Sequence, residues 1–154
     1  GQQFLQILKY LRRLYAYVIV DTPSMLTDVV LSSVDESDII VLIATQDIPA
    51  IKNARLFLDL VSSLGVERER IVFTMNRYDK RIGITPEKIG ENLKVDVAAI
   101  IPLDERVVIP SVNRGVPFIL GSKPQPASEG ILSLAERIRE RIVSNETEDD
   151  VGLR

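Results

Sequence analysis

Residues 17–24 read Tyr17-Val18-Ile19-Val20-Asp21-Thr22-Pro23-Ser24 and decide the fold. The β-branched run from Val18 to Val20 predicts a strand that is covered on both faces, as in a parallel sheet. Pro23 lacks the backbone N–H that a sheet needs, so we expect the strand to end at Asp21. Ligands of open α/β sheets bind beyond the carboxyl ends of the strands. Asp21 is therefore a candidate Mg²⁺ ligand; the alternative is that it caps the next helix.

Strand and helix patterns alternate along the chain. Apolar runs predict strands at 39–44, 71–75, 97–101 and 117–120, and apolar periodicity predicts helices at 2–14, 25–34, 51–64, 86–92, 104–114 and 130–143. Pro110 lies inside the fifth of these helices, which we therefore expect to kink or to form two pieces. The alternation predicts an α/β fold with a mostly parallel sheet flanked by helices. We assign residues 1–143 to one domain and 144–154 to an acidic, disordered tail.

Polar residues follow the predicted strands, namely Asp21, Asp47, Asn76 and Asp104. Because the carboxyl ends of parallel strands share one edge of a sheet, these side chains are placed to line one site. The plain alternative is that loops are polar in any protein and that these residues only cap turns and helices.

Composition excludes several classes of protein. The 154 residues include no cysteine and no histidine, which rules out disulfides, thiolate metal sites, His-based general base catalysis and a Ser-His-Asp triad. The net charge of −3 and the pI of about 5.1 argue against non-specific nucleic-acid binding. No apolar run is long enough to span a bilayer, and Arg12 and Arg13 interrupt the apolar positions near the N-terminus, unlike a signal peptide. We expect a cytoplasmic protein.

An ordered set of motifs resembles the C-terminal half of MinD/ParA-type ATPases, which are P-loop NTPases with a deviant phosphate loop. The motifs are Val-Ile-Val-Asp-Thr-Pro at 18–23, Ile-Lys-Asn-Ala at 51–54, Met-Asn-Arg-Tyr at 75–78, Ile-Pro-Leu-Asp at 101–104 and Val-Asn-Arg-Gly-Val-Pro at 112–117. Within this family the chain looks most like the CpaE/TadZ branch, which is linked to Flp (Tad) pilus assembly, and Gly-Ile-Thr at 83–85 fits that branch. The resemblance covers roughly Tyr17 to Ile138. Each motif alone is common, but their order is fairly specific.

On the phosphate side, the resemblance implies ATP and Mg²⁺ as ligands. Asp21 would help to hold Mg²⁺ and to orient water near the γ-phosphate, as the catalytic acid of the parent. Thr22, Pro23 and Ser24 would form the switch segment that senses the phosphate.

On the base side, the resemblance implies that Asn76 hydrogen-bonds the adenine edge and that Arg77 lies against the base. An amide suits adenine because it offers both a donor and an acceptor. Pro102, through its backbone, and Asp104 would border the base and the ribose. The alternatives are a turn cap for Asn76, an ion pair for Arg77 and a helix cap for Asp104.

The phosphate loop of the family, Lys-Gly-Gly-x-Gly-Lys-Thr, does not occur in the sequence; the nearest string, Gly121-Ser122-Lys123, lacks the upstream glycine. That loop supplies most of the phosphate and Mg²⁺ contacts. The chain also opens on a helix before any strand, so we interpret it as the second half of a larger ATPase. Alone it should bind nucleotide weakly or not at all and should not hydrolyse it. Turnover that is abolished in Asp21→Ala would contradict this expectation.

The expected partners follow from the same resemblance. The parent would form a homodimer around ATP and work with proteins of a pilus or positioning system. An exposed sheet edge would also favour self-association of this chain. The acidic stretch at 145–150 predicts no direct membrane binding, since anionic lipid would repel it; pelleting with anionic liposomes would refute this.

Three other interpretations compete with a truncated ATPase. A non-catalytic localisation or scaffold module of the same fold cannot be separated from it by sequence. A receiver domain of response-regulator type would use Asp21 as phospho-acceptor, Thr45 as switch hydroxyl and Lys123 as the lysine. However, two further strands separate Thr45 from Lys123, which should be one unit apart, and no acidic pair precedes Asp21. Acetyl phosphate labelling of Asp21 would identify a receiver domain. A Rossmann dehydrogenase would need Gly-x-Gly-x-x-Gly after a strand, and the sequence has none.

Overall fold

The structure is a computed structural model that describes residues 2–121 and 123–152, and the side chains of these residues as far as Ser144. The chain divides into two compact units, Gly1–Ile40 and Val41–Arg154.

The first unit holds two helices, α1 (Gln2–Leu14) and α2 (Asp28–Glu36). Arg12 near the end of α1 donates to the Glu36 carbonyl oxygen at 3.1 Å and to the Asp38 carboxylate at 2.8 Å, which ties α1 to the end of α2. The predicted helix at 2–14 is confirmed. The next helix begins at Asp28 rather than at residue 25, because the Thr27 side chain caps it by accepting from the Val30 N–H at 3.4 Å.

The stretch between these helices is not the buried strand that we predicted. Residues 17–23 are irregular, with Tyr17 65% exposed and Ile19 94% exposed. A strand needs a neighbour to satisfy its backbone N–H and C=O groups, and among the described residues no strand pairs with this segment. Its β-branched residues favour an extended backbone but do not form a strand alone, so this prediction is wrong.

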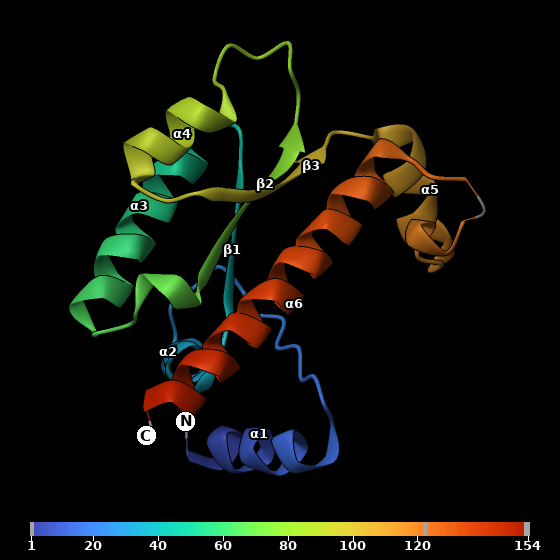
Figure 1. Ribbon diagram of the computed structural model, residues 1–154. Helices are drawn as coiled ribbons and strands as arrows, with labels where there is room; N and C mark the ends of the chain where they lie inside the picture. Colours follow the sequence, from blue (N-terminus) through green and yellow to red (C-terminus); the bar gives the residue numbers. More distant parts are fainter. Residues whose placement is uncertain (1, 122, 153–154) are drawn as a thin grey trace. The chain divides into compact units, whose positions relative to one another are not determined.

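The second unit is built on a three-stranded parallel sheet in the order β1-β2-β3 (Figure 1). The strands are β1 (Ile40–Thr45), β2 (Ile71–Tyr78) and β3 (Val97–Pro102), with Phe73 opposite Val97 in the parallel β2–β3 pair. Every residue of β2 from Ile71 to Met75 is buried, as expected of a central strand that is covered on both faces. The predicted α/β class and these three strands are confirmed.

Helices cover both faces of this sheet (Figure 1). The helices α3 (Ile48–Ser63) and α4 (Pro86–Leu93) lie on one side, and α6 (Pro126–Gly152) runs across the other along β3 and β2. A short 3₁₀ turn, η1 (Arg68–Arg70), leads into β2. The largest fully buried side chains among the described residues are Phe73, Met75, Leu93, Val61, Val72 and Thr74.

The elements after β3 differ from the prediction. The helix α5 (Glu105–Arg114) is one element that continues through Pro110, so the alternative of two pieces is wrong, whereas a kink at Pro110 stays a prediction. A proline in a helix removes a single backbone hydrogen bond, which does not have to end the helix. Residues 118–120 form a 3₁₀ turn, η2 (Phe118–Leu120), and not a strand, because three residues that follow a proline have no partner in the described sheet.

The last helix is longer than predicted at both ends. It starts at Pro126, a residue suited to the first turn, and its backbone continues to Gly152, past the expected end at residue 143. The side chains of the acidic stretch at 145–150 lie outside the described residues, as does Ser122.

Candidate functional site

An open hollow of about 390 Å³ lies where the strands of the second unit end. Its walls come from the exits of all three strands and from the loop after β2, and the lining residues are Thr45, Gln46, Asp47, Arg77, Asp79, Ile82 and Leu103. The carboxyl edge of a parallel sheet is where ligands bind in open α/β folds. The exits of β1, β2 and β3 therefore meet at one concave site, although of the four polar exit residues that the sequence predicted only Asp47 lines it.

An irregularity in β2 aims Arg77 at this hollow. Met75 lies opposite Ile100 and Tyr78 lies opposite Pro102, so β2 carries one residue more than β3 between these two pairs. Arg77 adopts a left-handed backbone conformation with a φ of +56°. Such bulges redirect a side chain and are common beside binding sites, where strained backbone also gathers. The bulge falls on the Asn-Arg pair that the sequence singled out.

The base-side residues gather around this bulge. The Asn76 side-chain oxygen accepts the Arg77 N–H at 2.9 Å, a local bond of the kind that the turn-cap alternative describes. The Leu103 N–H donates to the Tyr78 carbonyl oxygen at 2.9 Å and joins the exits of β2 and β3. Pro102 is the last residue of β3. The structure thus places Asn76, Arg77 and Pro102 on one edge of the sheet.

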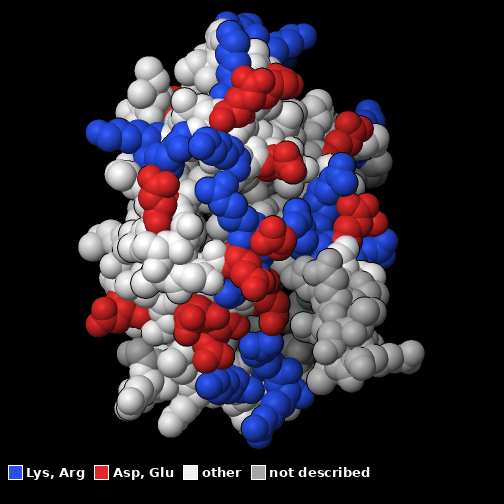
Figure 2. All heavy atoms as spheres, turned by 60° about the vertical axis from the view of Figure 1, so that its left-hand side comes forward, with Lys and Arg blue, Asp and Glu red and all other residues white. Residues whose placement is uncertain are grey.

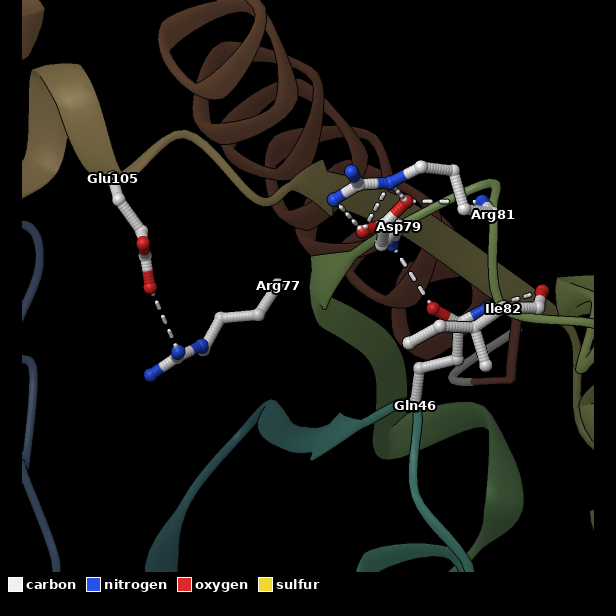
Figure 3. Close-up of polar contacts among 6 residues, drawn as sticks. All are labelled: Gln46, Arg77, Asp79, Arg81, Ile82 and Glu105. Carbon is white, nitrogen blue, oxygen red and sulfur yellow. Dashed lines mark hydrogen bonds and ion pairs between the residues drawn. The ribbon is translucent and has the colours of Figure 1, made fainter.

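Arg77 also makes the ion pair that was its alternative role. Its guanidinium lies 3.4 Å from the Glu105 carboxylate, with both side chains about 60% exposed (63% and 60%; Figure 3). An exposed pair of this length is weak and easily exchanged for another partner. Asp104 occupies the N-cap position of α5, but among the described residues its side chain accepts no hydrogen bond from that helix.

Asp47 acts as a helix cap, which is the alternative role given above for polar residues that follow a strand. Its carboxylate accepts the Ala50 N–H at 2.9 Å at the start of α3 and also accepts from the Thr45 hydroxyl. The Thr45 hydrogen bond and the Ala50 N–H lower the pKa of Asp47.

Two residues of the hollow were missed by the sequence analysis, Gln46 and Asp79. Gln46 is buried, and its side-chain oxygen accepts the Asp79 N–H at 2.9 Å. The Asp79 carboxylate binds the Arg81 guanidinium through N–H···O contacts of 2.9 Å (Figure 3), and this hydrogen bonding lowers the pKa of Asp79 to about 2. Asp79 stands three residues after Asn76, and this position at a strand exit is the signal by which the sequence could have identified it. No sequence pattern signals that Gln46 is buried.

The phosphate-side residues belong to the first unit. Asp21, Thr22, Pro23 and Ser24 are all exposed in the irregular segment between α1 and α2. Among the described residues, no three Asp, Glu, His or Cys side chains gather to hold a metal ion. Asp21 is the one carboxylate among these four residues, so a Mg²⁺ ion held there would need substrate phosphates as further ligands. The switch and metal roles stay predictions, and no catalytic step is derived from them.

On the one face that Figure 2 draws, lysine and arginine side chains are interspersed with acidic ones. The expectation that the chain binds neither nucleic acid nor membranes directly stays a prediction. Within the described part of the chain, no helix combines the length and apolar character that crossing a bilayer requires.

A parallel sheet between helices, with a hollow at the carboxyl ends of its strands, defines an α/β protein. Solved MinD structures share this fold. MinD of Aquifex aeolicus, in a MinC:MinD complex, matches with a TM-score of 0.80 at 22% identity, covering 90% of this chain and 58% of that one. MinD of Pyrococcus horikoshii OT3, in complex with Mg-ADP, matches with a TM-score of 0.74 at 22% identity, covering 88% of this chain and 55% of that one.

The sequence itself is similar to MinD. It is 27% identical over 138 residues to the septum site-determining protein MinD of Thermotoga maritima, covering 86% of this chain and 50% of that protein. The chain thus spans about half the length of the relatives that it matches. No protein-family model matches it. The similarity supports the MinD/ParA resemblance, whereas the likeness to the CpaE/TadZ branch stays a prediction.

Proposed function

We propose that this chain belongs to an ATPase-type positioning protein of the MinD/ParA kind and supplies the base side of its nucleotide site. The observation that carries the proposal is the hollow at the strand exits, which Arg77 lines next to the bulge at Asn76, in a chain similar to MinD over most of its length. The Mg-ADP complex of the Pyrococcus relative supports nucleotide and Mg²⁺ as ligands of the whole protein.

The lining of the hollow suits a flat heteroaromatic ring. Ile82 and Leu103 give apolar surface for its faces, and the Arg77 guanidinium is a plane that can stack on it. Asn76 offers an amide to the polar edge once its local bond to the Arg77 N–H is shared or exchanged. The base, and not the phosphates, is therefore the part of ATP that this chain binds.

Binding through the base alone is weak. The sequence holds no phosphate loop, so the backbone amides and lysines that hold phosphates in P-loop proteins have no counterpart in these 154 residues. We place the dissociation constant near 1 mM, about −4 kcal/mol. In this proposal the chain alone does not hydrolyse ATP, and Asp21 with residues 22–24 completes the phosphate side only in the whole protein.

The process that we propose is Flp pilus assembly of the CpaE type, because Lys-Asn-Ala at 52–54 and Gly-Ile-Thr at 83–85 fit that branch. The whole protein would dimerise and act on protein partners, and the MinC:MinD complex of the Aquifex relative supports a protein partner. A non-catalytic scaffold on the same fold is the second candidate, favoured by the same missing phosphate loop.

The test compares Mg·ATP with adenosine. Both are titrated into the 154-residue chain and followed by NMR shifts, for the unsubstituted protein and for Asn76→Ala and Arg77→Ala. We expect the unsubstituted chain to bind both ligands with equal dissociation constants of about 1 mM. Both variants should bind each ligand at least tenfold more weakly. Asn92→Ala is the matched control, since this amide sits on α4 and bonds Arg55 at 3.1 Å, outside the hollow.

Two results would overturn the proposal. If neither Mg·ATP nor adenosine binds at millimolar concentration, the chain has no base-binding pocket. Micromolar binding of ATP, about −8 kcal/mol, without any binding of adenosine would mean that other groups hold the phosphates.

A further inference from the structure

Gln46 is a buried amide that bridges two parts of the chain at the hollow. It follows β1 directly and is 6% exposed. Its side-chain oxygen accepts the Asp79 N–H at 2.9 Å, and its side-chain nitrogen lies 3.4 Å from the Ile82 carbonyl oxygen (Figure 3). The same nitrogen also donates to the Ile84 carbonyl oxygen. The amide thus contacts both ends of the loop that follows β2.

That loop, residues 79–85, shapes one wall of the hollow. Asp79 and Ile82 line the hollow from it, and its last residue, Thr85, caps α4 by accepting the Lys88 N–H at 3.4 Å. Inside the loop, the Ile82 N–H donates to the Asp79 carbonyl oxygen at 3.0 Å. The loop has no strand ladder, so its shape depends on this turn, on the hydrogen bonds between Asp79 and Arg81 and on the contacts from Gln46.

We propose that Gln46 is a positioning residue for the base pocket, whose amide holds the 79–85 loop so that Asp79 and Ile82 face the bound base. This rests on the proposed function. The role requires a group that donates and accepts at once, because it faces both an N–H and carbonyl oxygens. Leucine can do neither, and an ionised carboxylate can only accept.

The substitutions Gln46→Leu and Gln46→Glu separate these requirements. In Gln46→Leu, the Asp79 N–H and the Ile84 carbonyl lose their partner. We expect the Asp79 amide to exchange with solvent at least tenfold faster and adenosine to bind at least tenfold more weakly. Ser111→Ala is the control: Ser111 is 7% exposed and its hydroxyl donates to the Val116 carbonyl oxygen at 2.6 Å, away from the hollow. It should lower the melting temperature without changing either readout.

Gln46→Glu should make adenosine binding depend on pH, an effect that is not expected if Gln46 only stabilises the fold. Ionised, the introduced carboxyl repels the two carbonyl oxygens; protonated, it donates again. Adenosine binding should therefore recover by at least threefold as the pH falls from 8 to 5. The charged groups around this position are Asp47, Asp79, Arg77 and Arg81. The pKa values of Asp47 and Asp79 are lowered and that of Arg81 is raised, so these three groups keep their charge over this range.

The outcomes are distinguishable. If the unsubstituted chain fails to bind adenosine, the proposed function falls and the pocket role of Gln46 falls with it. If the unsubstituted chain binds and Gln46→Leu binds equally well, only the role of Gln46 is overturned. Should Gln46→Leu fail to fold, the pH series of Gln46→Glu decides alone, and affinity that does not change with pH overturns the inference.

Discussion

Gly130 of α6 lies against the backbone of Ile100 in β3: a Cβ built on Gly130 would come within 2.7 Å of the Ile100 carbonyl oxygen. It would also lie 3.0 Å from the Cα of Ile101. These atoms are backbone and cannot rotate away, so α6 packs this closely on the sheet only because this residue has no side chain. The same strand ends at Pro102, which borders the candidate site.

Gly130→Ala should therefore destabilise the protein. Overpacking costs about 1–3 kcal/mol, and the better helix propensity of alanine returns up to about 1 kcal/mol. We expect a net loss of about 1–2 kcal/mol, measured by urea unfolding. Gly83→Ala is the matched control, because a Cβ there meets no described atom within 4 Å and its stability should stay within about 0.5 kcal/mol. Equal behaviour of the two variants would refute the close contact.

Asp47→Ala should destabilise α3. Its carboxylate is the N-cap acceptor for the Ala50 N–H, and losing such a cap costs about 1 kcal/mol. Asp104→Ala offers a comparison at the same cap position of α5, where within the described residues no cap hydrogen bond forms, and it should cost less. Thermal unfolding of both variants tests this. A larger loss in Asp104→Ala would mean that its carboxylate does cap α5.

Asp79 should titrate unusually low. The Arg81 hydrogen bonds hold its pKa at about 2, whereas an unfolded aspartate titrates near 3.9. Because the folded pKa is the lower one, this contact contributes stability at higher pH, and the contribution is lost as the pH falls from about 4 to about 2. In Arg81→Ala the Asp79 pKa should rise toward 3.9, as followed by the Asp79 carboxyl carbon shift in NMR. Arg81→Lys keeps the charge without the guanidinium fork and should fall between the two. An unchanged Asp79 pKa in Arg81→Ala would show that other groups hold it down.

The sequence predicted the sheet well where local pattern and neighbours agree. The mostly apolar stretches 39–44, 71–75 and 97–101 correspond to β1, β2 and β3, and each of these strands pairs with a neighbour in the sheet. The pattern at 17–20 is equally apolar, yet without a partner among the described strands it stays irregular and exposed. Pattern alone cannot say whether a neighbour exists, because strand pairing is a long-range property.

The candidate site was predictable only in part, for a similar reason. Asn76 and Arg77 were identified by their place after an apolar run, but the bulge that redirects Arg77 arises from the register with β3. Gln46 was not identified, because its role depends on carbonyl groups that lie 36 and 38 positions further along the chain. Ordinary polar residues gain a specific role when the fold brings distant backbone to them.

Arg77 and Lys94 allow backbone strain to be separated from ligand binding. Both have left-handed backbones, with φ of +56° and +55°, but Arg77 lines the hollow and Lys94 ends α4. Glycine tolerates this conformation better than alanine by about 1 kcal/mol. At each position the glycine variant should therefore be more stable than the alanine variant by about 1 kcal/mol in urea unfolding. Arg77→Gly and Arg77→Ala should both lose adenosine binding, since both remove the guanidinium, whereas both Lys94 variants should bind normally. Retained binding in Arg77→Gly would show that the bulge, and not the guanidinium, makes the pocket.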